Sequence, residues 1–483
     1  RVVAAFGDEA PQEITRGVIE HGAESTITAL LRAWWPFTLL ASLASRRVRC
    51  RVAVALIGVT AVEYAHSQRR VDPVGGIALR SPAPIGEGAR TGGGEWWCFV
   101  EHDYRAGAMS LPSAIVPSRL DDLIGRARCE VDEGRMPGFQ LAVGFECDIV
   151  YAEAYGEARD DARFHTYSAV KPTVSLTAME LAAEGLFDLD DPVASILPTF
   201  GTNGKEAITV SQVLLHKGGF PGAPMAPRIA ADRDARLQRY ETWRTTWEPG
   251  TRFEYHPSSA HWVLADLIEE VSGRVYVDVI TERVMEPAGQ PRWLAIPEPD
   301  QGDITDVYCV GEPAGPAEFE AQFGVALPVT EVTDDALTSF NDPAVRAMGQ
   351  PGGGGITSAS GFASWYQAIL HDDGEILRPE VKHDALNVIR QTHKDAIGVS
   401  ANRTHAFILA GGDGRANGRG HGHTVSSMTF GHGGARGQLA WADPASGVSF
   451  GFMTHGLQRH RLQDSRRSVA ISTKAGLLTT PVD

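Results

Sequence analysis

The sequence predicts a mixed α/β domain whose single antiparallel sheet is built from both of its ends. Residues 139–156 alternate apolar and polar side chains around Glu146-Cys147-Asp148, which is typical of a β-hairpin. Near the C-terminus, residues 437–442 and 447–453 are strand-like runs separated by the turn sequence Asp443-Pro444-Ala445-Ser446-Gly447. Helical patterns lie between the two hairpins, so we expect the early and late strands to pair in one sheet.

Apolar periodicity and stop signals predict the helices of this domain. A helical pattern over Asp121–Glu133 precedes the first hairpin. A second pattern runs over Ser168–Glu184 and ends at Gly185, and a third runs over Trp262–Val271 and is closed by Gly273. These helices are expected to flank the sheet.

Length and charge place a domain boundary near residue 115. A chain of 483 residues is long for one compact domain. Residues 1–119 carry 13 Arg against 11 Asp and Glu, whereas the whole chain has a formal net charge of -16. We therefore expect a small, mainly helical N-terminal segment over residues 1–115 and a larger α/β domain over residues 116–483. Such an acidic chain is not expected to bind nucleic acid.

The N-terminal segment contains two apolar stretches, residues 33–45 and 52–61, on either side of the arginine-rich run Arg46–Arg51. Each is shorter than the roughly 18 to 20 residues that a membrane-spanning helix needs. They fit either two buried core helices or an interfacial hairpin whose arginines contact anionic lipid. Weak contact with a membrane surface is therefore one of two open interpretations.

The cysteines and the N-terminus indicate the expected compartment. The cysteines are odd in number, scattered and without a C-x-x-C pair, which favours reduced thiols. Residues 1–20 are polar and show no secretory signal. We therefore expect a cytoplasmic protein, with membrane-peripheral attachment as the alternative. The five cysteines are Cys50, Cys98, Cys129, Cys147 and Cys309.

Ser168 and Lys171 are the first candidates for chemistry. Lys171 is the first lysine of the chain, and on a helix its side chain would lie within hydrogen-bonding reach of Ser168. A lysine held against a serine in a partly desolvated pocket can act as its base. The spacing alone recurs by chance, so its meaning depends on two further clusters. These are Tyr255 within Phe253–Ser258, and Gly431-His432-Gly433-Gly434-Ala435, which is expected to open a strand.

In this order the three clusters resemble the motifs of the serine β-lactamase and penicillin-binding-protein superfamily, in particular class C β-lactamases and family VIII carboxylesterases. The resemblance covers residues from about 120 to 483 and includes the landmarks Leu214–Pro221, Gly352–Ser358 and Gly437–Pro444. It implies a β-lactamase-like fold, in which an antiparallel sheet flanked by helices is joined to a mostly helical subdomain. It implies no cofactor and no metal.

The resemblance also implies roles for individual residues. Ser168 would attack an acyl carbonyl and form an acyl-enzyme, with Lys171 as its proton partner. Tyr255 would complete the base system by passing a proton to the leaving group and activating the deacylating water. The backbone N–H groups of Ser168 and Ala435 would bind the oxyanion. The residues expected to bind substrate are His432, Gly433, Gly434, Arg436 and Ser258.

Three departures from the family pattern narrow the function. His432 stands where penicillin-recognising enzymes have a lysine, which argues against efficient β-lactam hydrolysis. Pro257 replaces the asparagine of the second motif, and neither Ser258 nor Ser259 supplies both the donor and the acceptor of an amide. Arg436 follows the oxyanion residue, where it either meets a substrate carboxylate or is solvated.

Other histidines favour structural roles. His421 and His423 lie near His432, which invites a metal site, but their Gly- and Arg-rich loop does not favour one. His216 is expected to hold a loop. His256 and His261 flank Tyr255, where tuning of the tyrosine and simple packing are equally open.

The function predicted from these residues is that of a serine hydrolase acting on small-molecule acyl esters, a carboxylesterase without a cofactor. An amidase or D-amino-acid peptidase using the same residues is the nearest alternative. A β-lactamase or cell-wall carboxypeptidase is less favoured because of His432. A binding module with a degenerate pocket is the alternative outside catalysis.

Residues 21–110 resemble a different protein, the C-terminal tail of mycofactocin-type glycosyltransferases. The resemblance rests on Trp35-Pro36, Asp72-Pro73-Val74 and Gly94-Glu95-Trp96-Trp97-Cys98. None of these residues carries glycosyl-transfer chemistry. No transferase activity is therefore expected.

Overall fold

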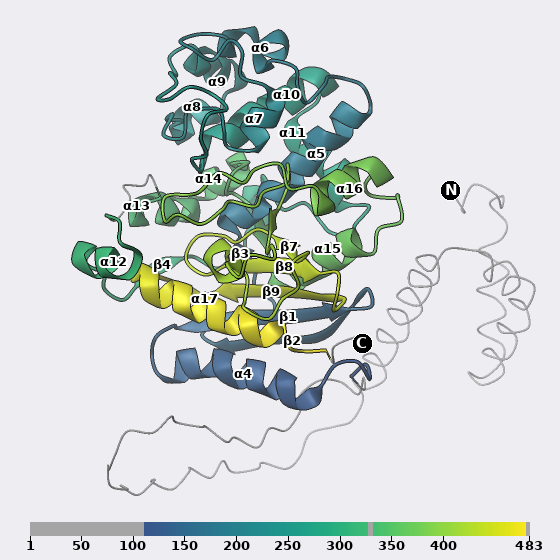
Figure 1. The fold of residues 1–483 in the computed structure, drawn as a ribbon, viewed down its shortest axis with the longest axis vertical. Coiled ribbons are helices and arrows are strands. Elements are labelled where there is room, and N and C mark those ends of the chain that lie inside the picture. Colours follow the sequence, from purple (N-terminus) through teal and green to yellow (C-terminus); the bar gives the residue numbers. More distant parts are fainter. Residues whose placement is uncertain (1–110, 327–331, 480–483) are drawn as a thin grey trace, which may run out of the picture. The chain divides into compact units, whose positions relative to one another are not determined.

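The structure is a computed structural model that describes residues 111–326 and 332–479 (Figure 1). Most of the predicted N-terminal segment, its resemblance to a glycosyltransferase tail and its membrane contact lie outside these residues. Within them, no helix combines the length and the apolar character needed to cross a bilayer.

Six antiparallel strands form the central sheet, in the order β2-β1-β9-β8-β7-β6. Strand β1 pairs with β9, with Phe139 opposite Thr454, so an early and a late strand of the domain are neighbours. This confirms the predicted sheet. The strands are β1 (Gly138–Phe145), β2 (Asp148–Gly156), β6 (Ile408–Leu409), β7 (Phe430–Gly431), β8 (Leu439–Asp443) and β9 (Val448–Thr454).

Left-handed backbone conformations mark the turn of the first hairpin and the segment before β8. Glu146 and Cys147 join β1 to β2 with φ values of 51° and 70°, as tight hairpin turns require. The strand predicted over residues 437–442 begins later, at Leu439, because Arg436 and Gly437 adopt left-handed conformations with φ values of 60° and 97°.

Both faces of the sheet are covered, which explains why every residue of β1 is buried. On one face, Phe139 belongs to a core shared with α4 (Pro117–Asp132) and α17 (Arg461–Ala475). On the other face, Ala142 belongs to the core of α15 (Ala359–Leu370) and the helical part of the molecule. Figure 1 shows α4 and α17 together on their side of the strands.

A mostly helical part lies beyond the sheet, at the top of Figure 1, and is centred on α5 (Lys171–Ala183) and α10 (Ser259–Ser272). It confirms the predicted helical subdomain. Its other helices are α6 (Val193–Ile196), α7 (Val210–Leu214), α8 (Pro227–Ala230), α9 (Arg233–Tyr240), α11 (Tyr276–Ile280), the π-helix Thr281–Met285, α16 (Pro379–Asn387), which packs on α5, and the 3₁₀ turn Pro198–Phe200.

Short elements connect the helical part to the sheet. β3 (Phe164–His165) pairs with β5 (Ile356–Thr357), and β4 (Tyr308–Val310) pairs in parallel with β10 (Gly456–Gln458). The remaining helices are α12 (Pro316–Phe323), α13 (Asp334–Thr338) and α14 (Pro343–Met348), with 3₁₀ turns over Glu298–Asp300, Ser339–Asn341 and Ala416–Arg419.

The predicted helices occur, with shifted ends. Helix α4 begins at Pro117, because proline has no N–H to satisfy at the first helical position. The helix predicted over residues 168–184 is divided into a 3₁₀ turn over Tyr167–Val170 and the α-helix that starts at Lys171. Helix α10 ends before Gly273, whose φ of 66° forms the expected left-handed stop.

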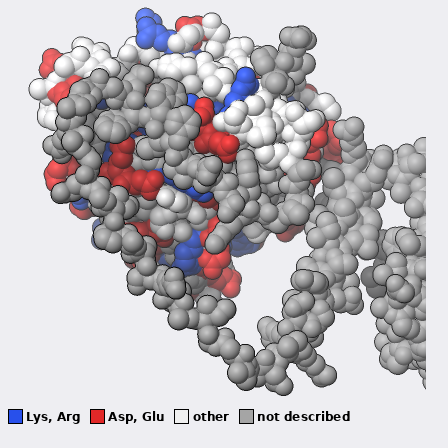
Figure 2. Space-filling model, turned by 90° about the horizontal axis from the view of Figure 1, so that it is seen from below, with Lys and Arg blue, Asp and Glu red and all other residues white. Residues whose placement is uncertain are grey.

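Charges of both signs are interspersed on the described surface shown in Figure 2. Helix α4 illustrates the pattern, because Glu130 pairs with Arg126 at 2.6 Å and with Arg135 at 2.9 Å. Lys474 of α17 pairs with Asp122 of α4 at 3.1 Å. Neither sign forms a continuous patch on the described part of this face.

Candidate active site

Ser168 lies on a sharp turn between β3 and α5. The preceding residue, Tyr167, has a φ of 46°, which is unusual for a bulky side chain. Its ring is buried, and its hydroxyl donates to the carbonyl of Leu337 at 3.3 Å. These contacts hold the strained turn in place and leave Ser168 half-buried.

The ammonium of Lys171 lies beside this serine, as the sequence predicts. Its Nζ donates to Ser168 Oγ at 3.1 Å and to the carbonyl of Pro257 at 2.7 Å, and it also donates to the carbonyl of Gly352. The side chain is 1% exposed. These three contacts fix Nζ directly against Ser168 Oγ.

The glycine-rich landmark 352–358 is explained by close backbone approach. A Cβ atom on Gly355 would lie 2.4 Å from Thr166 Oγ1, and one on Gly352 would lie 3.0 Å from the carbonyl oxygen of Pro257. Only glycine lets this segment approach both the turn that carries Ser168 and the carbonyl that binds Lys171.

The ring of Tyr255 lies beside Lys171, with Nζ 5.3 Å from the ring centroid. The guanidinium of Arg403 lies 5.1 Å from the same centroid, and the ring of His216 lies 4.7 Å away. The Tyr255 hydroxyl is buried and has no hydrogen-bond partner among the described residues. The predicted proton path through this hydroxyl therefore stays a prediction, since catalytic hydrogen bonds often form only with substrate present.

Two histidines hold the segment that carries Tyr255. The His216 ring accepts a hydrogen bond from the backbone N–H of His256 at 3.3 Å, which is the loop-holding role expected of it. The ring of His256 accepts from the N–H of Phe220 at 3.1 Å and donates to the carbonyl of Glu254 at 2.6 Å. Burial lowers the pKa of His256 to about 4, so this ring is neutral.

The third motif, which carries one of the two predicted oxyanion donors, packs against the turn before Ser168. A Cβ atom on Gly434 would lie 2.1 Å from the carbonyl oxygen of Thr166, so the two backbones touch. Ala435 packs against the cluster that contains Tyr167. Neither the N–H of Ser168 nor that of Ala435 donates to another backbone group of the described residues, which leaves both available to an oxyanion.

The third motif does not open a strand, contrary to prediction. Strand β7 ends at Gly431, and His432 to Ala435 enter the turn that leads to β8. The backbone ladder nevertheless continues, because the N–H of His432 donates to Ala440 at 3.1 Å and that of Gly434 donates to Gln438 at 2.9 Å.

His432 is a neutral ring and not a substitute for the family's lysine. Its Nδ1 donates to the carbonyl of Gly433 at 2.9 Å, and its Nε2 faces Arg403 Nη1 at 3.4 Å. Burial, followed by the positive charges of Arg403 and Lys171, holds the pKa of His432 well below its usual value. Sequence reasoning missed Arg403, because no motif or spacing marks it.

Two other predicted substrate-binding residues are already engaged. Arg436 pairs with Asp334 at 2.9 Å and donates to the carbonyl of Gln458 at 2.8 Å. Its guanidinium is therefore held by groups of the protein itself and is not solvated. Ser258 Oγ accepts from Gln350 Nε2 at 3.0 Å. Their contact with substrate stays a prediction, and Gln350 is a further site residue that the sequence did not reveal.

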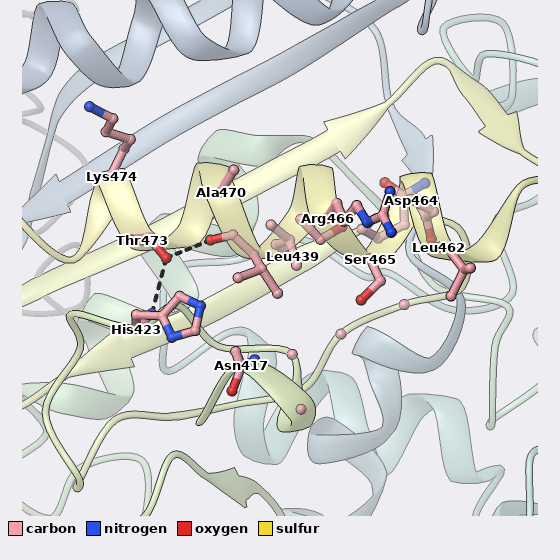
Figure 3. A pocket seen from close by; sticks show the side chains of 18 of the residues that line it. Asn417, His423, Leu439, Leu462, Asp464, Ser465, Arg466, Ala470, Thr473 and Lys474 are labelled. Atoms are coloured by element: carbon pink, nitrogen blue, oxygen red, sulfur yellow. Dashed lines mark hydrogen bonds between the residues drawn. The ribbon is translucent and has the colours of Figure 1, made fainter. Parts of the chain in front are cut away.

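A cavity of about 770 Å³ lies on the α17 side of the third motif (Figure 3). Gly433 and Gly434 line it, but Ser168 and Lys171 do not. His423 binds α17 through its backbone N–H, which donates to Thr473 Oγ1 at 3.0 Å. Within the described residues no group of three His, Cys, Asp or Glu side chains is arranged to hold a metal ion.

A second serine, Ser211, belongs to a serine-histidine-aspartate chain of hydrogen bonds. Its Oγ lies 2.9 Å from His405 Nε2, and His405 Nδ1 lies 2.8 Å from Asp384 Oδ2. The N–H of Ser211 donates to Leu189 at 2.7 Å, so it is not available as an oxyanion donor. This chain links α7, α16 and the turn after Arg403.

The fold and this geometry can be compared with known proteins. Residues 123–473 match the family described as Beta-lactamase. Esterase EstB of Burkholderia gladioli is 28% identical over 229 residues, which cover 40% of this chain and 57% of EstB. Esterase/beta-lactamase LipL of Mycobacterium tuberculosis is 24% identical over 308 residues, which cover 59% of this chain and 67% of LipL. The match with EstB thus spans little more than half of that protein.

Solved structures share the fold. A family VIII carboxylesterase has a TM-score of 0.61 and 21% identity, with 76% of this chain and 100% of that chain covered. EstA from Arthrobacter nitroguajacolicus has a TM-score of 0.59 and 20% identity, with 76% and 99% covered. Because the family match covers more than half of the sequence, the chain belongs to the β-lactamase family of serine hydrolases.

Proposed function

We propose that this protein is a carboxylesterase that cleaves small acyl esters through an acyl-enzyme on Ser168. The proposal rests above all on the Lys171 ammonium, which donates to Ser168 Oγ at 3.1 Å from a 1% exposed position. A buried cation beside a hydroxyl stabilises the alkoxide that forms as the serine loses its proton.

Each step of the reaction uses different residues of the site. Ser168 Oγ attacks the ester carbonyl, and its proton passes to Tyr255, which acts as the phenolate beside the amine of Lys171. The oxyanion of the tetrahedral intermediate binds the N–H groups of Ser168 and Ala435. The alcohol leaves with the proton from Tyr255, and the tyrosine then takes a proton from the water that opens the acyl-enzyme.

Esters are the proposed substrates because the third motif supplies no cation to hold a substrate carboxylate. His432 is neutral, and its Nδ1 is already used on the carbonyl of Gly433. EstB is named an esterase, which supports the same class, whereas LipL is named both an esterase and a beta-lactamase.

Labelling with diisopropyl fluorophosphate tests the nucleophile. We expect one covalent adduct per chain, which peptide mapping by mass spectrometry assigns to Ser168. Ser211 is the internal control, because its hydrogen bond to a histidine resembles that of a nucleophile but its N–H is occupied. An adduct on Ser211 alone, or full esterase activity in Ser168→Ala, would exclude the proposal.

A panel of substrates tests the reaction class. We expect the highest kcat/KM with p-nitrophenyl acetate and butyrate. Preference for D-aminoacyl p-nitroanilides would identify an amidase or peptidase, and preference for nitrocefin would identify a β-lactamase. Ligand binding without turnover of any of these compounds would favour a binding module.

A further inference from the structure

Arg403 occupies an unusual position for a half-buried guanidinium. It lies over two aromatic rings, 5.1 Å from the centroid of Tyr255 and 5.5 Å from that of Phe253. Its Nη1 lies 3.4 Å from His432 Nε2. Among the described residues no carboxylate forms an ion pair with it, although buried charges are normally paired. A salt bridge within the described residues therefore does not account for the position of this guanidinium.

The turn that carries Arg403 is held firmly. The carbonyl of Arg403 accepts from the N–H groups of Arg390 at 2.9 Å and Gln391 at 3.0 Å. Two residues later, His405 is fixed by Asp384 at 2.8 Å and Ser211 at 2.9 Å. The hydrogen-bond chain of Ser211 thus fixes the turn from which the guanidinium reaches Tyr255.

The surroundings of Tyr255 contain two cations and several neutral rings. Burial and neighbouring positive charges hold the pKa values of His216, His261 and His432 well below their usual range. Burial lowers the pKa of Arg403 to about 10, which leaves it charged at neutral pH. The titratable groups around Tyr255 and Arg403 are Lys171, His216, His256, His261, Asp395 and His432.

We propose that Arg403 is a positioning residue that supplies the second positive charge at the site, in place of the lysine that His432 replaces. It acts through Tyr255, because a cation over the ring favours the phenolate that takes the proton of Ser168. Its hydrogen bond also fixes His432 as the neutral tautomer. The inference rests on two parts of the proposed function, Ser168 as the nucleophile and Tyr255 as its base.

The test measures the second-order rate of Ser168 labelling by uncharged diisopropyl fluorophosphate between pH 5 and 9. The rate rises with pH as the site loses the proton that its base must release before it can take the proton of Ser168. Loss of a cation raises the pKa of a base that works as an anion, so the acidic limb moves to higher pH. For Arg403→Gln we expect a shift of about one to two pH units, from a unit charge acting over about 5 Å.

Three variants separate charge from structure. Arg403→Lys keeps the charge, and the acidic limb of its pH–rate profile should stay within about half a pH unit of that of the wild type. Arg403→Met keeps a long apolar side chain and replaces the glutamine variant if that one does not fold, with the same shift expected. Arg252→Gln is the matched control, because it removes an exposed guanidinium three residues before Tyr255 that pairs with Glu254.

The outcomes distinguish this inference from the proposed function. Absence of labelling in the wild-type protein contradicts the role of Ser168. Labelling with an unmoved limb in folded Arg403→Gln or Arg403→Met contradicts the role of Arg403 alone. An equal shift in Arg403→Lys also overturns it, since the charge would then not matter.

Discussion

Gly434 is where one added methyl group is expected to damage the predicted oxyanion hole most directly. A Cβ atom there would lie 2.1 Å from the carbonyl oxygen of Thr166 and 2.8 Å from Gln438 Cβ. Both neighbours belong to packed backbone or to a buried side chain, so neither can move away cheaply. We therefore expect Gly434→Ala to separate the third motif from the turn that carries Ser168.

The size of the effect follows from this distance. Ordinary contact begins at 3.4 Å, so the two backbones must separate by about 1.3 Å, the difference between 3.4 and 2.1 Å. The N–H of Ala435, one residue later, moves with Gly434. Loss of one oxyanion donor lowers kcat by roughly 100- to 1,000-fold, about 2.7 to 4 kcal/mol, and displacement by about 1 Å can cost as much.

Steady-state hydrolysis of p-nitrophenyl butyrate measures this prediction. We expect kcat to fall by the factor above with KM changed much less, because the donor acts on the transition state. Gly412→Ala is the control, since its Cβ would meet only Ser427 Cβ at 3.9 Å and should leave kcat unchanged. Retention of more than a third of the wild-type kcat in a folded Gly434→Ala protein would refute the reasoning.

Three further changes test other parts of the molecule. Lys171→Arg should lower kcat at least about 1,000-fold in the ester assay without unfolding the protein, because a planar guanidinium cannot occupy a site shaped for an ammonium. Gln350→Ala should lower kcat by about three- to tenfold, with KM nearly unchanged, because it breaks the 3.0 Å bond to Ser258 that joins the two segments whose carbonyls hold the lysine. In the wild-type protein the buried Arg236 lies 2.6 Å from the carboxylate of Asp266, so Asp266→Ala leaves Arg236 buried without its main partner. It should reduce the free energy of unfolding in urea by about 3 to 5 kcal/mol, and an unchanged midpoint would contradict this.

The elements that could be predicted are those whose signals are local. The hairpin over residues 139–156 follows from two-residue alternation, and the late hairpin follows from the turn Asp443–Gly447. The start of β8 could not be predicted from apolar character, because the left-handed backbone at Arg436 and Gly437 delays it to Leu439. The pairing of the two hairpins in one sheet was predictable, whereas the short strands β6 and β7 were not, because two residues each are too few for a periodic signal.

The site was predictable where a motif joins neighbouring residues, and not where distant loops meet. Ser168 and Lys171 share one turn, so their spacing revealed them. Arg403 and Gln350 reach the site from loops that lie far from both along the chain; no motif marks Arg403, and Gln350 lies just before the landmark Gly352–Ser358 without being part of it. Only packing brings them there, and packing of loops depends on contacts that no periodicity records.

The acceptors around Lys171 indicate which residue takes the proton of Ser168. The carbonyls of Pro257 and Gly352 both accept hydrogen bonds from Lys171 Nζ, and such acceptors favour the ammonium, which also donates to Ser168. A lysine held in this way lowers the cost of the serine alkoxide but is poorly placed to take the proton itself. Tyr255 is the group left to receive it, because its hydroxyl is buried without a partner in the described residues and cations flank its ring. The pH dependence of Ser168 labelling should therefore respond to the charges around Tyr255, and Arg403 is the one that can be removed without touching the serine or its lysine.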